Sequence, residues 1–103
     1  MAELTVSALE TRLREATLRL RDSASAADVR EARCTIDAAE RTLGDLSLDP
    51  WEPSVLPLRR AREILSSHLL AATACERADT PVDVIAAMLC RGADAAGRLL
   101  AVG

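Results

Sequence analysis

Apolar side chains recur at alternating spacings of three and four residues in two stretches of this chain, and this repeat constrains the fold more than any other feature. Such spacing places the side chains on one face of an α-helix and is typical of a helix-packing seam. The seam residues are Val6, Leu9, Leu13, Ala16 and Leu20 in the first stretch, and Val29, Ala32, Ile36, Ala39 and Leu43 in the second. Because the two seams match in length, they predict a long N-terminal antiparallel αα-hairpin over residues 2–43.

Capping residues indicate where the second of these helices begins and ends. Ser25 and Asp28 lie in a stretch of small polar residues that breaks the repeat, and either side chain could cap a helix that starts there. Gly44 follows the last seam residue, in the position where a glycine commonly ends a helix. We therefore expect the second helix to stop at Leu43.

The rest of the chain predicts a crossover followed by shorter helices. Residues 44–57 hold three of the four prolines and Trp51, the only aromatic residue, and this composition indicates an ordered crossover. The predicted elements after it are helices over 57–77, 81–91 and 93–102, separated at Gly92. The sequence therefore predicts an all-α fold, a small helical bundle in a single domain spanning 1–103, with the hairpin and a three-helix C-terminal half.

Composition narrows the class of protein further. Of the 103 residues 50% are apolar, but Phe and Tyr are absent, so the core must be filled by Leu, Ala, Val and Ile in closely packed helices. The net charge of −3 provides no field to hold nucleic acid or an anionic membrane. Three cysteines and the lack of any stretch near ~20 apolar residues predict a cytoplasmic protein with free thiols. Arginine without lysine indicates a GC-rich bacterial genome.

The only histidine, His68, lies on the apolar face of the helix predicted over 57–77, seven residues before Cys75. Seven residues span about 10.5 Å along a helix, so one metal ion would reach both side chains only if each were stretched along the axis. The preferred interpretation is a core or half-buried histidine with a hydrogen-bond partner, and we expect neither a metal nor a cofactor. A small metal- or thiol-dependent enzyme using His68 with Cys75 or Cys90 is an alternative.

Residues 80–100 resemble the helix-turn-helix of small regulators, with Gly92 near the turn. The resemblance implies a regulator that binds nucleic acid through its second helix. That helix would present Ala93, Asp94, Ala95 and Ala96 at its N-terminal end, where base-reading side chains belong. A buried helix pair is therefore preferred, and a nucleic-acid-binding regulator is a second alternative.

Arg59, Arg60 and Arg62 gather in the first turns of the third predicted helix, where the helix dipole disfavours cations. An anion should compensate for them. The candidate anions are Asp45, Asp49 and Glu52 of the crossover, or an acidic partner or phosphate held by bidentate hydrogen bonds. The cluster is therefore a candidate anion-binding site.

Each helix of the predicted hairpin also carries a second stripe of apolar or small residues, roughly opposite its seam. The stripes consist of Leu4, Thr11 and Leu18 on the first helix and Ala27, Cys34 and Ala38 on the second. One flank of the hairpin can face the rest of the domain, whereas the other needs a partner. We therefore expect a non-enzymatic protein–protein interaction module, such as an adaptor, a chaperone or an assembly subunit, that forms a symmetric homodimer through this face.

Overall fold

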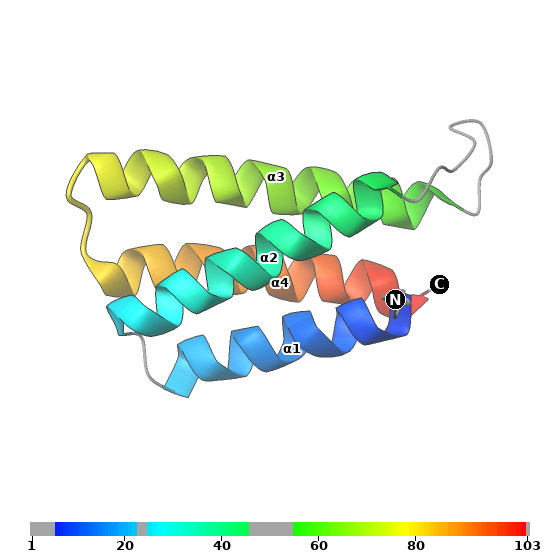
Figure 1. Ribbon diagram of the computed structural model, residues 1–103, viewed down its shortest axis with the longest axis horizontal. Helices are drawn as coiled ribbons and strands as arrows, with labels where there is room; N and C mark the ends of the chain where they lie inside the picture. The colour runs from blue at the N-terminus through cyan, green and yellow to red at the C-terminus, as the bar shows by residue number, and fades with distance from the viewer. Residues whose placement is uncertain (1–5, 23–24, 46–54, 103) are drawn as a thin grey trace.

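The computed structural model describes residues 6–22, 25–45 and 55–102 of the chain. Its helices are α1 (Val6–Asp22), α2 (Ala26–Asp45), α3 (Leu56–Arg77) and α4 (Val82–Val102), and these described ranges contain no strand. Each helix runs antiparallel to the one before it, so the start of α1 and the end of α4 lie at the same end of the bundle (Figure 1). The predicted all-α helical bundle is confirmed.

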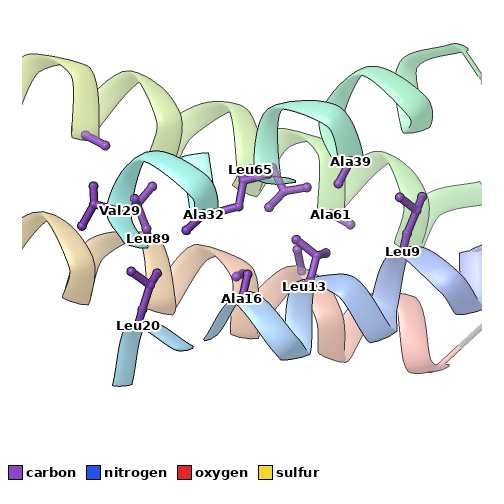
Figure 2. Close-up of a cluster of buried hydrophobic side chains, with 14 of the residues drawn as sticks. Leu9, Leu13, Ala16, Leu20, Val29, Ala32, Ala39, Ala61, Leu65 and Leu89 are labelled. Atoms are coloured by element: carbon purple, nitrogen blue, oxygen red, sulfur yellow. The ribbon is translucent and has the colours of Figure 1, made fainter. Parts of the chain in front are cut away.

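The hydrophobic core lies where the four helices face one another (Figure 2). All seam residues predicted for α1 and α2 are buried except Val6, which is half-buried. The remaining helices contribute Ala61, Leu65 and Ala72 from α3 and Ile85, Ala86, Leu89, Ala93, Ala96 and Leu100 from α4. Alanine makes up much of this core, so the helix backbones can approach closely without leaving voids. The two seams were therefore predicted correctly as core positions.

α4 is the most apolar of the four helices, and it makes the most extensive contacts in the bundle. It packs against α1 on one side and against α3 on the other. α1 and α2 are antiparallel neighbours, as predicted, but α1 packs more extensively on α4 than on α2. The hairpin is thus one side of a shared core and not a separate unit.

The C-terminal half contains two helices and not three, because α4 continues through Gly92. Gly92 is buried, and no described glycine has a positive φ. A Cβ atom at Gly92 would lie only 2.6 Å from Cγ and 2.8 Å from Cβ of His68 on α3. Glycine is therefore needed for the close approach of α3 and α4, and the predicted separation into helices 81–91 and 93–102 is wrong. The turn required by the helix-turn-helix resemblance is absent from this helix.

The second helix also extends past its predicted glycine stop, since α2 ends at Asp45. A Cβ atom at Gly44 would lie 3.1 Å from Nε of Arg62, so this glycine accommodates an arginine of α3. At the other end of α2, the predicted cap is confirmed: the Asp28 amide donates to Ser25 Oγ at 3.1 Å. The Ser25 hydroxyl in turn donates to the Asp28 carboxylate at 2.9 Å, so two hydrogen bonds join these residues.

The turn between α3 and α4 has a Schellman-type geometry. Asp79 adopts a left-handed conformation with φ 56°, which aspartate tolerates better than most residues. The Thr80 amide donates to the Cys75 carbonyl at 2.9 Å and the Asp79 amide to the Glu76 carbonyl at 3.2 Å. These two bonds satisfy carbonyls at the end of α3 and direct the chain back along the bundle as α4.

Residues 1–5 and 46–54 lie outside the described part of the chain. The expectations for Leu4, Trp51 and the crossover acids Asp49 and Glu52 therefore stay predictions. Within the described residues, no helix is both long enough and apolar enough to cross a membrane.

Candidate functional site

His68 lies half-buried on the side of α3 that faces α4, directly over Gly92. Its Nδ1 atom is 2.8 Å from the carbonyl oxygen of Ile64, one turn earlier. A carbonyl can only accept, so Nδ1 carries the proton and donates it to this bond. The interpretation of His68 as a half-buried side chain with a hydrogen-bond partner is confirmed, and its contact with Gly92 is a packing contact.

The thiols are not assembled with this imidazole. Cys90 lies on the side of α4 that faces α1, where its Sγ donates a weak hydrogen bond to the Thr17 carbonyl at 3.7 Å. His68 contacts the other side of α4, and Cys75 follows it seven residues later on α3. Among the described residues no group of three or more His, Cys, Asp or Glu side chains could hold a metal ion.

Burial raises the pKa of the Cys90 thiol, a nearby arginine, Arg21, lowers it in part, and Asp94 raises it further. Because the thiolate is the nucleophile, Cys90 should react slowly with thiol reagents. In the folded protein at pH 8 we expect Ellman's reagent to modify the exposed Cys34 first and Cys90 much later. Equal rates for these two cysteines in folded protein, measured by mass spectrometry of the labelled peptides, would contradict this environment for Cys90.

The raised pKa of Cys90 also predicts how stability depends on pH. Below the ordinary pKa of 9.0, the thiol is protonated in the folded and unfolded states, and its contribution to stability is fully present. Above pH 9 the unfolded chain loses this proton first, so the free energy of unfolding should fall as the pH rises through the folded pKa. Urea unfolding measures this free energy at pH 8 and at pH 10. The decrease from pH 8 to pH 10 should be smaller for Cys90→Ala than for the wild type.

One arginine of the cluster at the start of α3, Arg62, pairs with an acid of α2. Arg62 Nε lies 3.6 Å from a carboxylate oxygen of Glu40 on α2, and not against a described crossover acid. Glu40 also accepts a hydrogen bond from the Ser66 hydroxyl at 2.7 Å. Glu40 lies within the span predicted for the second helix, and the packing of α2 against α3 brings its carboxylate next to Arg62. Arg59 and Arg60 are exposed.

The described residues of the two stripes predicted to bind a partner are exposed, but they do not form one continuous face. Thr11 and Leu18 are exposed on α1, and Leu18 lines a groove between α1 and α4. Ala27, Cys34 and Ala38 are exposed on α2, and Cys34 lines a groove between α2 and α3. A charged groove between α1 and α2 separates them, where Arg19 forms an ion pair with Glu31 at 2.7 Å.

The groove between α2 and α3 has a volume of about 450 Å³ and is a candidate docking surface. The residues that line it are Arg30, Arg33, Cys34, Asp37, Leu69, Leu70 and Thr73. Arg33 joins the two helices across the groove, since its guanidinium donates to Thr73 Oγ1 at 2.7 Å and pairs with Glu76 at 2.5 Å. Leu70 remains 73% exposed, which exceeds the 53% of Leu18.

Leu70 was absent from the sequence-based set of partner-binding residues. It lies next to the half-buried Leu69, and the run of apolar residues around it gives no local sign that one side chain points outward. The angle around the helix axis could have identified it, because Leu70 lies about 140° from the buried Leu65. A leucine so far from the buried face of its helix is expected to face solvent or a partner.

No family model, curated protein or solved structure matches this chain. The candidate site is therefore defined by the geometry and chemistry of the described residues themselves.

Proposed function

We propose that this protein is a non-enzymatic protein-interaction module that binds a protein partner through the face formed by α2 and α3. The observation that carries this proposal is the exposure of Leu70, 73% of which is open to solvent beside the α2–α3 groove. Covering a leucine side chain fully contributes about 1.5–3 kcal/mol, a gain that this chain does not obtain by folding. An adaptor, a chaperone or an assembly subunit would obtain it by binding.

The surroundings of Leu70 support the same proposal. Protein interfaces commonly have an apolar centre and a polar rim. Leu70 and Cys34 supply apolar or small surface at the centre of this face, while ion pairs such as Arg41–Asp37 and Arg33–Glu76 lie around it. Charges that are already paired within the chain cost less to cover than isolated charges.

The places of the histidine and the thiols support an interaction role over a catalytic one. His68 is engaged with Ile64 and packed on Gly92, and Cys90 points toward α1. A nucleophilic mechanism needs a base within hydrogen-bond reach of the thiol. The net charge of −3 also favours a protein partner over nucleic acid. We place this role in the bacterial cytoplasm that free cysteines and the arginine-only composition indicate.

Site-specific photocrosslinking in the native cells tests the proposal. A photoreactive amino acid is introduced at Leu70 or, as the matched control, at Leu18, the exposed leucine of α1. We expect a discrete crosslinked product from position 70, identified by peptide mass spectrometry, and little or none from position 18. The product should be lost when Glu63, another exposed residue of α3, is changed to Arg. No product at position 70, or the same product at position 18, would overturn the proposal.

A further inference from the structure

The exposed face of α3 carries opposite charges at equal distances from Leu70. Glu63 lies seven residues before Leu70 and Arg77 seven residues after it, and all three side chains are exposed. Seven residues complete nearly two helical turns, so the three share one face at intervals of about 10.5 Å. Within the described residues neither Glu63 nor Arg77 has an ion-pair partner. This face therefore has two unpaired charges placed symmetrically about an exposed leucine.

Such an arrangement is self-complementary. If a second copy is turned by a two-fold axis that crosses α3 at Leu70, the two α3 helices run antiparallel and the leucines meet at the axis. Each Glu63 then lies opposite the partner's Arg77, and the same pair forms twice. Contacts of this reciprocal kind define an isologous dimer interface.

α2 also carries opposite charges on either side of an exposed residue. This residue lies at nearly the same height along the bundle axis as Leu70 of α3. Cross-helix hydrogen bonds set the level, and they join Arg33 to Thr73 and Glu40 to Ser66, each at 2.7 Å. In this antiparallel register Leu70 lies opposite Ile36, two residues from Cys34, or about 3 Å along the helix. The same two-fold axis therefore crosses α2 close to Cys34.

Around Cys34, α2 presents Arg30 on one side and Asp37 on the other, both lining the groove. Rotation about an axis level with Ile36 leaves each Arg30 five residues, or about 7.5 Å along the helix axis, from the partner's Asp37. Arg30 forms no ion pair within the described residues. Asp37 already accepts from Arg41 at 3.1 Å, but a carboxylate can accept from two guanidinium groups. The direct charge match with a second copy is therefore the Glu63–Arg77 pair of α3, and α2 contributes opposite charges within about 7.5 Å along the helix axis.

We infer that the partner on the α2–α3 face is a second copy of this chain, bound in a symmetric antiparallel dimer with Leu70 and Cys34 near its two-fold axis. The inference rests on the proposed interaction function and names the partner. It differs from the homodimer expected from sequence, since the interface is built by α2 and α3 and the α1 stripe stays outside it.

Charge reversal on α3 tests the dimer. By light scattering at tens of micromolar, the wild type should have twice the 11.0 kDa mass of the chain. Glu63→Arg places like charges together at both symmetric contacts and should raise the dimer dissociation constant by about tenfold or more. Arg77→Glu should have the same effect. The double variant Glu63→Arg/Arg77→Glu restores opposite charges at both contacts and should regain the wild-type mass.

A matched control is Arg91→Glu, which reverses an exposed arginine on α4 and should leave the mass unchanged. Circular dichroism of every variant should match the wild type, because these side chains are exposed. A wild-type mass of 11.0 kDa, or a double variant no more dimeric than the single variants, would overturn the inference.

Cysteine crosslinking gives an independent reading of the interface. A short bismaleimide should join two chains through Cys34, and Cys34→Ser should abolish the product. A dimer that gives no Cys34 crosslink would overturn this geometry. If purified protein is monomeric but photocrosslinking at position 70 captures a different, identified protein, the second copy is wrong and the interaction function stands. If photocrosslinking at position 70 captures no protein, the homodimer and the proposed interaction function are both wrong.

Discussion

Replacing Leu13 by alanine should lower the free energy of unfolding by about 2–5 kcal/mol. Leu13 is 0% exposed and lies in the centre of the core, on the face of α1 that points toward the other helices (Figure 2). The substitution removes apolar contacts and leaves a cavity that closely packed helices cannot fill without moving. In a protein of this size, whose total stability is commonly about 5–15 kcal/mol, this is a large fraction. Urea denaturation followed by circular dichroism measures the change.

Leu18→Ala is the matched control on the same helix, because Leu18 is 53% exposed. Surface substitutions usually change stability by within about 0.5 kcal/mol, so this variant should unfold near the wild-type midpoint. Similar losses at both positions would contradict the orientation of α1 in the bundle.

Gly92→Ala should destabilise the protein, although alanine is the better helix former. The new Cβ would lie 2.6 Å from Cγ and 2.8 Å from Cβ of His68. Rotating the imidazole cannot relieve the contact with Cβ, so α3 and α4 must move apart. Overpacking of a tight contact typically costs about 1–3 kcal/mol, which exceeds the helix-propensity gain of about 0.5–1 kcal/mol. A lower melting temperature by calorimetry checks this prediction.

Gly97→Ala provides the control of opposite sign on α4. A Cβ at Gly97 meets no atom within 4 Å, so only the helix-propensity gain remains and the protein should become more stable. The cost at Gly92 should also shrink in a His68→Ala background, which a double-mutant cycle would measure as a coupling between the two residues. Stabilisation by both glycine replacements would show that α3 and α4 do not approach closely at His68.

The helices of α1 and α2 and their buried faces could be predicted from the sequence because the information is local. A repeat of three and four residues defines one face of a helix, and residues such as Leu13 and Ile36 are buried as that repeat predicts. Ser25 caps α2 through a hydrogen bond to Asp28, three residues away, so this feature was also readable.

The roles of the glycines could not be predicted from the neighbouring sequence, since a glycine after a helical run can have either of two structural roles. It can end the helix in a left-handed conformation, or it can make room for another element. Gly92 and Gly44 both lie inside helices, where they accommodate His68 and Arg62 of α3. These are contacts between residues far apart in sequence. The continuing repeat from Leu89 through Ala93 and Ala96 was the better guide, because it carries one buried face across Gly92.

The candidate site could be predicted only in part for a related reason. Periodicity places Leu18 and Cys34 away from the buried seams of α1 and α2, and both are exposed. It does not say which neighbouring helix borders each of them. The ion pair of Arg19 with Glu31 lies between α1 and α2, whereas Leu70 joins Cys34 from α3, a helix that the predicted hairpin did not include.

Hydroxyl-radical footprinting in intact cells tests most directly whether the α2–α3 face binds protein. In the isolated chain Leu70 is 73% exposed and Leu18 53%, so solvent access alone makes Leu70 the more reactive of two identical side chains. If a protein covers the α2–α3 face, oxidation of Leu70 should fall well below that of Leu18, and urea should restore it. Leu70 oxidised as fast as or faster than Leu18 in the cell would contradict a protein-binding role for this face.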